Sequence, residues 1–298
     1  MRVLITGAAG FAGGWLARAC LAAGDEVVGL SREDVDLRDA AGIRTALRGA
    51  RPQVVYHLAA LSSVGASWEH PADTVNENVA ASVNLLEALR REAPGARVVW
   101  ASSCQVYGEP DRVPVEEDAP LRPENPYAVS KTAGDLLAGV YAEAHGIDLV
   151  RARPFNHAGP GQRDGFIVSS LARQAAQARV SGARQIDIVT GNPDARRDYT
   201  DVRDVVSAYR GLARAGVGGV FNVSSGRSVS AAELVRLLAD VIAPVEVSHT
   251  VDPARVRAHE VMDLAGSHER LTAATGWRPA IPLEQTMLET IEWWQREL

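Results

Sequence analysis

The sequence predicts an α/β protein built on a doubly wound parallel sheet, with a smaller α/β domain that is discontinuous in sequence. In the first half of the 298 residues, short apolar runs alternate with longer segments of helical period. A glycine-rich turn directly follows the first apolar run. Regular alternation of strand and helix is typical of a parallel sheet that helices cover on both faces. The second half is less regular and favours a smaller second domain.

The apolar runs and the helical segments give the expected elements in chain order. We expect strands in the first half over Val3–Ile5, Glu26–Leu30, Gln53–Leu58, Arg97–Ala101 and Asp148–Ala152. Helices are expected between and after them, over Phe11–Ala23, Ala40–Arg48, Ala72–Ala93, Pro126–His145, Phe166–Arg179, Val202–Ala215, Ala231–Ala243 and Leu283–Glu297. We expect the sheet domain to comprise residues 1–156 and about 192–224, and the smaller domain about 157–191 and 225–298.

Composition excludes several classes of protein. The formal charge is −6 and hydrophobic residues make up 46% of the chain, which is typical of a globular protein with a large core. The two cysteines, Cys20 and Cys104, are too few for a disulfide framework and have no metal-ligand spacing, so we expect a reducing, cytoplasmic setting and no metal. No segment approaches the ~20 apolar residues of a membrane span, and no signal peptide begins the chain. An acidic chain also gives no reason to expect nucleic acid as a partner.

The glycine-rich turn indicates a dinucleotide site. Gly7, Gly10 and Gly13 enclose Phe11 and Ala12 and lie between the first strand and the first helix. In that position, backbone N–H groups and the helix N-terminus can meet a pyrophosphate. A plain tight turn is the less favoured alternative.

The end of the second expected strand bears on the choice of cofactor. An NAD site usually has an acidic residue here for the ribose 2′-hydroxyl, but Leu30 is followed by Ser31 and Arg32. A small hydroxyl and a guanidinium suit a 2′-phosphate, so NADP(H) is favoured and NAD(H) remains an alternative. Arg32 could instead be a solvated loop cation.

Lys131 is the only lysine among the 31 Lys and Arg residues, and it follows Tyr127 by four residues. On a helix this spacing places both side chains on one face. A nearby ammonium favours the phenolate, so we expect it to lower the pKa of Tyr127 from about 10 toward neutral pH. Such a pair suits general acid–base chemistry.

These motifs, in this order, resemble the extended short-chain dehydrogenase/reductase family and its Rossmann-type fold. The resemblance rests on the glycine turn, Asp36-Leu37, His57-Leu58-Ala59-Ala60, Asn78, Ser102-Ser103-Cys104-Gln105-Val106-Tyr107-Gly108, Tyr127 with Lys131, and Arg153-Pro154-Phe155-Asn156. It implies that Ser103, Tyr127 and Lys131 are catalytic. It also implies that the cofactor contacts, besides Tyr127, Lys131, the glycine turn, Ser31 and Arg32, are Asp36, Leu37, Leu58, Ala59, Ala60, Asn78, Pro154 and His157.

Later segments are similar to the nucleotide-sugar branch of that family, in particular its GDP-4-keto-6-deoxy-mannose reductases. They are residues 153–162, 196–202, 252–260 and 276–279. The resemblance implies that a nucleotide-diphosphate sugar contacts Ser103, Gln105, Asn156, Arg197, Arg257 and Glu260, with the two arginines on its phosphates. The implied reaction is NADPH-dependent reduction of a 4-keto-6-deoxyhexose, most closely GDP-4-keto-6-deoxy-D-mannose to GDP-D-rhamnose. A homodimer through Ala72–Ala93 and Pro126–His145 is also implied.

Gln105 separates the reductase hypothesis from the dehydratase hypothesis. Family dehydratases use an acidic residue, two positions after the Ser or Thr, to remove the C5 proton. An amide cannot accept that proton at neutral pH, so we expect dehydration to be absent or very poor. A nucleotide-sugar 4-epimerase and a non-catalytic NADP-sensing module are two further hypotheses that stay open. Cys104 is interpreted as a packing residue.

Overall fold

A computed structural model describes residues 1–256 and 260–298, and its main element is a sheet of six parallel strands. Their order across the sheet is β2 (Glu26–Leu30), β1 (Arg2–Thr6), β3 (Val54–His57), β4 (Arg97–Ala101), β5 (Leu149–Pro154) and β9 (Gly219–Val223). The chain leaves β1 toward β2 and then returns to the other side of β1 for β3. This reversal opens a crevice at the carboxyl ends of β1 and β3, where ligands of such folds bind. The predicted Rossmann-type fold is confirmed.

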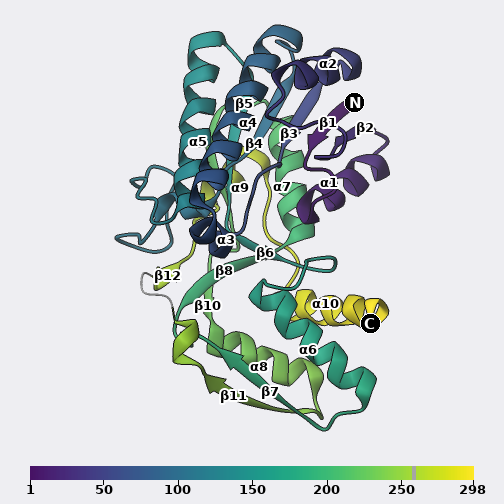
Figure 1. Cartoon of the computed structure of the whole chain (residues 1–298), viewed down its shortest axis with the longest axis vertical. Helices are drawn as coiled ribbons and strands as arrows, with labels where there is room; N and C mark the ends of the chain where they lie inside the picture. Colours follow the sequence, from purple (N-terminus) through teal and green to yellow (C-terminus); the bar gives the residue numbers. More distant parts are fainter. Residues whose placement is uncertain (257–259) are drawn as a thin grey trace.

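Helices cover both faces of the sheet (Figure 1). Side chains of α1 (Phe11–Ala22), α7 (Val202–Ala215) and α9 (Glu269–Thr275) form one buried apolar cluster with the sheet. Side chains of α2 (Ala40–Ala50), α4 (Pro71–Glu92) and α5 (Pro126–His145) form the other. Val3 and Ile5 belong to the first cluster and Leu4 to the second, so successive residues of β1 pack on opposite faces.

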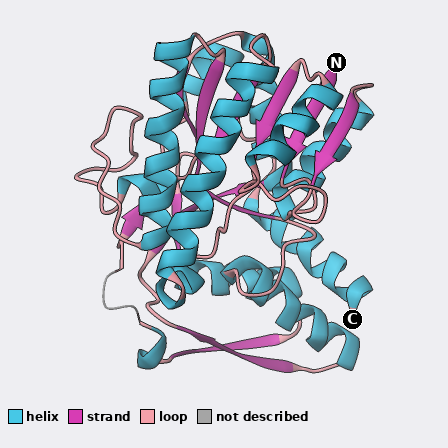
Figure 2. Ribbon diagram, turned by 45° about the horizontal axis from the view of Figure 1, so that its top comes forward, coloured by secondary structure: helices cyan, strands magenta, loops and turns pink. Residues whose placement is uncertain are grey.

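Most of the remaining strands and helices form a smaller lobe below the sheet (Figures 1 and 2). A four-stranded sheet comprises β6 (Asn156–Ala158), β8 (Arg196–Asp201), β10 (Ser228–Ser230) and β12 (Asp263–Leu264). The strands β7 (Gln185–Thr190) and β11 (Glu246–Val251) pair separately. A third apolar cluster joins α6 (Ile167–Ser181), α8 (Ala231–Ile242) and α10 (Leu283–Glu297). The domain limits proposed from the sequence remain a prediction.

The expected elements match those of the structure to within two residues at each end. Three short helices, namely α3 (Val64–Glu69) and the 3₁₀ turns η1 (Cys104–Tyr107) and η2 (Pro253–Arg255), were not expected, nor were α9 and the strands after β5. These segments are too short for a period of 2 or 3.6 residues to stand out. No helix of residues 1–256 or 260–298 is long and apolar enough to cross a membrane.

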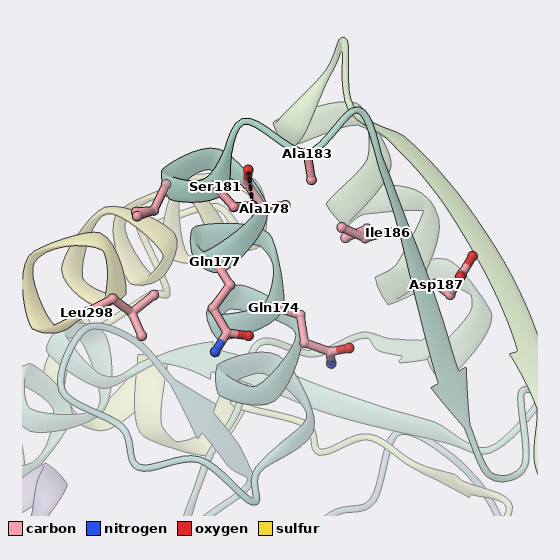
Figure 3. A pocket seen from close by; sticks show the side chains of 9 residues that line it. Gln174, Gln177, Ala178, Ser181, Ala183, Ile186, Asp187 and Leu298 are labelled. Carbon is pink, nitrogen blue, oxygen red and sulfur yellow. Dashed lines mark hydrogen bonds between the residues drawn. The ribbon is translucent and has the colours of Figure 1, made fainter.

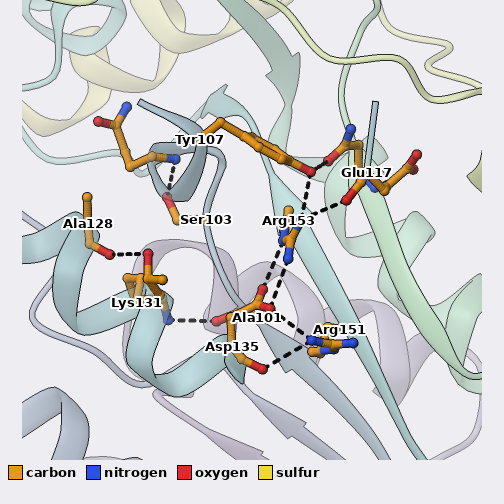
Figure 4. Close-up of polar contacts among 12 residues, drawn as sticks. Ala101, Ser103, Tyr107, Glu117, Ala128, Lys131, Asp135, Arg151 and Arg153 are labelled. Atoms are coloured by element: carbon orange, nitrogen blue, oxygen red, sulfur yellow. Dashed lines mark hydrogen bonds and ion pairs between the residues drawn. The ribbon is translucent and has the colours of Figure 1, made fainter. Parts of the chain in front are cut away.

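A buried polar network joins α5 to β5 of the large sheet (Figure 4). Both carboxylate oxygens of Asp135 on α5 accept hydrogen bonds from Arg153 on β5, at 2.9 and 3.0 Å, and Arg151 donates a third at 3.1 Å. Arg153 also donates to the Tyr107 hydroxyl at 3.0 Å and to the Glu117 carbonyl. Burial acts to raise the pKa of Asp135, but the Arg153 guanidinium outweighs it and holds that pKa below its usual value.

We expect Asp135→Ala to lower the free energy of unfolding by about 3–5 kcal/mol, because it leaves the buried Arg153 guanidinium without its counter-ion. Urea denaturation measures this change. Asp111→Ala is the matched control, since Asp111 pairs with Arg122 at the surface and such pairs contribute no more than about 1 kcal/mol. Equal losses in the two variants would contradict the network's role.

Candidate active site

The glycine turn has the geometry of a dinucleotide-binding turn. Gly7 has a φ of +75°, and a Cβ there would lie 2.9 Å from the Ala59 backbone nitrogen. A Cβ on Gly13 would lie 2.0 Å from the Gly7 carbonyl oxygen, which no side chain can satisfy. Gly10 is the N-cap of α1 and provides no side-chain acceptor for the first N–H groups of the helix. These features fit a pyrophosphate at the helix N-terminus, with Phe11 and Ala12 in its first turn.

The carboxyl end of β2 is held against this turn. The Leu30 carbonyl accepts hydrogen bonds from the backbone nitrogens of Gly7 and Ala8, at 2.8 and 3.3 Å. The Ser31 hydroxyl, which follows, donates to Asp34 at 2.6 Å. Arg32 forms an ion pair with Glu77 of α4 at 3.2 Å. The two residues predicted to meet a 2′-phosphate therefore lie at the crevice, and both have carboxylate partners.

Two further predicted cofactor residues lie in the loop after β2. Asp36 binds Arg38 through a side-chain bond of 2.6 Å, and hydrogen bonds from Arg38 lower the pKa of its carboxyl group to about 2. Leu37 packs against the apolar cluster under α2 and α4. This loop is exposed, so Asp36 is charged and accessible at neutral pH.

The loop after β3 carries Leu58, Ala59 and Ala60 and is held in place by Asn78 of α4. The Asn78 side chain accepts a hydrogen bond from the Leu61 nitrogen at 2.8 Å and donates to the Leu61 carbonyl and to Ser130 of α5. Asn78 thus ties the cofactor side of the crevice to the helix that bears Tyr127 and Lys131. Its side-chain oxygen and nitrogen are both engaged within the protein, and its predicted contact with the cofactor stays a prediction.

Ser103, Tyr127 and Lys131 come together at the carboxyl end of β4. Tyr127 and Lys131 lie four residues apart on α5, and both are buried at 8% exposure. The Lys131 ammonium donates to the Ala101 carbonyl at 2.6 Å, as Figure 4 shows. The Ser103 hydroxyl accepts from the Gln105 nitrogen at 3.2 Å, and Ser103 lies close enough to Tyr127 to influence the pKa of its phenol.

Protonation of this group differs from the expectation based on spacing alone. Burial raises the pKa of Tyr127 to about 12, with the Ser103 hydroxyl opposing part of that rise. The expected lowering of this pKa by Lys131 is therefore wrong, because desolvation of the buried phenol is the dominant cause and acts in the opposite direction. Burial also lowers the pKa of Lys131 to about 8, and Asp135 offsets part of this fall. At neutral pH the phenol keeps its proton and Lys131 is largely charged.

Gln105 lies in the turn η1 beside Ser103. Its side-chain oxygen lies 3.5 Å from the Asn125 amide nitrogen, and Asn125 is the N-cap of α5. Cys104 is buried within an apolar cluster with Val106 and Phe155, and burial raises the pKa of its thiol to about 12. This placement agrees with the packing role expected for Cys104.

The other predicted residues follow β5. Pro154 ends that strand, and His157 on β6 stacks on Phe11 of the glycine turn with ring centroids 5.9 Å apart. Asn156 pairs in register with Tyr199 on the neighbouring strand β8, which also carries Arg197. Arg197 is half-buried and donates to the Arg196 carbonyl at 2.7 Å. Glu260 is half-buried, and Arg257 lies outside the described residues.

Two residues that bind predicted site residues or the network beneath them, Asp135 and Glu77, were not predicted from the sequence. Asp135 occurs one helical turn after Lys131, and this i, i+4 spacing was a usable signal. Glu77 precedes Asn78, but nothing in its local pattern distinguishes it from an ordinary surface carboxylate. A surface hollow of about 570 Å³ lies elsewhere, between α6, the start of β7 and Leu298 (Figure 3). It contains no predicted site residue, and we assign it no role.

Comparison with known proteins places this geometry among nucleotide-sugar enzymes. Residues 33–290 match the model of the family described as GDP-mannose 4,6 dehydratase. The chain is 38% identical to GDP-6-deoxy-D-mannose reductase of Pseudomonas aeruginosa, over 99% of this chain and 97% of that protein. It is 30% identical to UDP-glucose 4-epimerase of Mycolicibacterium smegmatis, over 100% of this chain and 99% of that protein.

Solved structures give the same picture. RMD from Pseudomonas aeruginosa, complexed with NADPH, superposes with a TM-score of 0.89 at 34% identity and full coverage of both chains. The UDP-glucose 4-epimerase of Thermus thermophilus, in complex with NAD, gives 0.87 at 31% identity, again with full coverage of both.

The pKa of Lys131 can be measured directly, because it is the only lysine in the chain. Protein labelled with [ε-¹³C]lysine should show one lysine resonance in NMR, with a titration midpoint of about 8 in place of the usual 10.5. In urea the midpoint should return to about 10.4, since unfolding restores hydration. A folded-state midpoint near 10 would show that the ammonium is not desolvated.

Proposed function

We propose that this chain, which belongs to the GDP-mannose 4,6-dehydratase family of short-chain dehydrogenases/reductases, is a nucleotide-sugar 4-ketoreductase that uses NADPH. The proposed reaction is reduction of GDP-4-keto-6-deoxy-D-mannose to GDP-D-rhamnose. The observation that carries the proposal is the combination of Ser103, Tyr127 and Lys131 with an amide, Gln105, in the same loop as Ser103. This set supplies a proton to a carbonyl oxygen but lacks the carboxylate that dehydration needs at that position.

In the proposed mechanism, each of the three residues has a separate role. NADPH, when bound, supplies the hydride. Tyr127 gives its proton to the developing oxyanion, and a pKa near 12 means that the phenol carries this proton at neutral pH. The Ser103 hydroxyl accepts from the Gln105 nitrogen, so its own proton is free to hydrogen-bond the same oxygen. The Lys131 ammonium stabilises negative charge on Tyr127 after the transfer.

NADP(H) is the proposed cofactor. The glycine turn and the uncapped N-terminus of α1 would hold the pyrophosphate, and Ser31 and Arg32 would meet the 2′-phosphate. The NADPH complex of the Pseudomonas aeruginosa structure supports this choice. The NAD complex of the epimerase structure keeps NAD(H) as an alternative. Asp36, Leu37, Leu58–Ala60, Pro154 and His157 remain proposed contacts.

For the substrate, Arg197 and Arg257 are the proposed diphosphate contacts. Guanidinium groups bind phosphate oxygens in pairs, which suits a nucleotide diphosphate. Asn156 would position the diphosphate or the sugar, and Glu260 the nucleotide ribose. Ser103 and Gln105 would contact the hexose. The GDP base is proposed from the relation to GDP-6-deoxy-D-mannose reductase.

Asp198 is a buried carboxylate near Cys104 that could serve a dehydratase as a base, since burial raises its pKa to about 6. Its oxygens, however, accept hydrogen bonds from the Ser225 nitrogen and hydroxyl at 2.8 and 2.6 Å, and from the nitrogens of Gly226 and Gly266 at 3.0 and 3.3 Å. A carboxylate held by four donors is a poor base toward a ligand, so the dehydratase hypothesis is disfavoured. The UDP-glucose 4-epimerase relatives make 4-epimerisation the second candidate.

We also propose a homodimer through α4 and α5. Val129, Leu136 and Val140 on α5 are exposed at 45%, 52% and 59%, and their spacing places them along one side of that helix. An exposed apolar stripe of this kind suits a matching stripe on a second copy. Sedimentation equilibrium measures the mass in solution, and a monomer at micromolar concentration would contradict the proposal.

The test is incubation of the purified protein with NADPH and a panel of GDP- and dTDP-linked 4-keto-6-deoxyhexoses, with products identified by NMR. NADPH consumption with a new C4 hydroxyl on the GDP sugar is expected. Lys131→Arg is the control, because a wider guanidinium cannot replace the ammonium, and it should lose most turnover while the fold stays intact. Purification with bound NAD and interconversion of UDP-glucose and UDP-galactose would instead establish the epimerase.

Gln105→Glu tests the assignment of reaction type. A carboxylate of nearly the same size would lie near C5 of the sugar, and a base in reach of that proton can contribute ~10²–10⁴-fold. We expect the variant to keep measurable 4-keto reduction and to gain slow solvent-deuterium exchange at C5, followed by NMR. Wild-type protein that exchanges C5 as fast, or that converts GDP-mannose unaided, would replace the reductase proposal with the dehydratase.

A further inference from the structure

Glu77 on α4 lies between two arginines at the end of β2 where a 2′-phosphate is proposed to bind. Its carboxylate contacts the Arg32 guanidinium at 3.2 and 3.3 Å through its two oxygens. The same carboxylate contacts Arg38 at 3.5 Å. Glu77 therefore occupies the position of an anion shared by two cations, which is the role that a bound phosphate would also take.

The three side chains differ in how firmly they are held. Glu77 is only 24% exposed, and the next residue, Asn78, is fixed by hydrogen bonds to Leu61 and Ser130. Arg38 is anchored by Asp36, which accepts from it at 3.0 and 2.6 Å. Arg32 is 61% exposed, and its one ion pair is with Glu77 within the described chain. Of the two arginines, Arg32 is the one free to change partner.

The charges around this site favour a doubly charged 2′-phosphate less strongly than the presence of Arg32 in the sequence suggests. The Arg32 guanidinium contacts Glu77, the Arg38 guanidinium contacts Asp36 and Glu77, and a further carboxylate, of Asp34, binds the Ser31 hydroxyl next to Arg32 in the chain. Both guanidiniums already have carboxylate partners. A 2′-phosphate can form an ion pair with Arg32 only if the Arg32 side chain leaves Glu77. The bound phosphate then lies near the Glu77 carboxylate that Arg32 has left.

We propose that Glu77 is a specificity-determining residue, which competes with the 2′-phosphate for the Arg32 guanidinium and so limits the preference for NADPH over NADH. This inference rests on the proposed dinucleotide site. Arg38 has the complementary role, because it stays on Glu77 when Arg32 leaves and neutralises the carboxylate. Without Arg38, Glu77 repels the phosphate.

The test compares two fragments that differ in the 2′-phosphate alone, 2′,5′-ADP and 5′-AMP, by isothermal titration calorimetry at low salt. Glu77→Gln keeps the size of the side chain and removes its charge. We expect it to bind 2′,5′-ADP about two- to fivefold more tightly than wild type does, the range that an exposed ion pair allows, with 5′-AMP unchanged. The ratio of kcat/KM for NADPH over NADH should rise by a similar factor.

Glu33→Gln is the matched control. It removes one negative charge beside Arg32, but Glu33 is exposed and makes no ion pair within the described residues. It should leave the 2′,5′-ADP to 5′-AMP ratio close to that of wild type. Equal gains from Glu33→Gln and Glu77→Gln would mean that net charge, not competition for Arg32, sets the ratio, and would overturn the proposal.

Arg38→Gln supplies the second arm. It should weaken 2′,5′-ADP binding more in wild type than in the Glu77→Gln background, because Asp36 is then, among the described residues, the one partner of Arg38 that remains charged. Equal losses in both backgrounds would mean that Arg38 does not act through Glu77 and would overturn its assigned role. Binding of both fragments to wild type with no response to Glu77→Gln would overturn the inference alone. Failure of wild type to bind either fragment would overturn the dinucleotide site as well.

Discussion

The buried contact between Asp135 and Arg153 is the interaction on which the arrangement of the proposed catalytic residues depends. It joins α5, which carries Tyr127 and Lys131, to β5, the strand between β4 and β9. Arg153 extends the connection to Tyr107 in the turn that begins with Ser103. An ion pair with 0% and 4% exposure cannot exchange with water, so it holds these elements in a fixed relation. The network therefore fixes α5, which bears Tyr127, relative to the turn that follows Ser103.

Burial also sets the protonation of the site. Burial keeps the proton on the Tyr127 phenol at neutral pH, and Lys131 stays largely charged although burial lowers its pKa to about 8. This distribution suits donation of a proton to a carbonyl oxygen. Negative charge arriving on Tyr127 in the reaction would then be stabilised by Lys131 in a medium of low dielectric, where the attraction is stronger than in water. Asp135 moderates the effect, because it raises the pKa that burial lowers in Lys131.

The sequence predicted the large sheet and its helices because long segments repeat their apolar residues with a clear period. It also located the glycine turn. Glycine is required at position 13, because a Cβ there would lie 2.0 Å from the Gly7 carbonyl oxygen. The sequence did not predict the pKa of Tyr127, which depends on burial by residues distant in sequence. Nor did it indicate Glu77, which reaches Arg32 across 45 residues of chain. Contacts between separate elements leave no local pattern to detect.

The exposure of Arg32 suits a cofactor that dissociates from the enzyme after each turnover. A reductase consumes one reduced dinucleotide in each turnover, whereas an epimerase restores its own and can hold it tightly. An ion pair with 61% exposure at one partner is weak and screened by salt, so exchange of Arg32 between Glu77 and a phosphate involves only a small difference in free energy. A built-in competitor for Arg32 would shorten the residence of the oxidised cofactor. The site would then trade some affinity for faster release, which favours the proposed reductase over the epimerase.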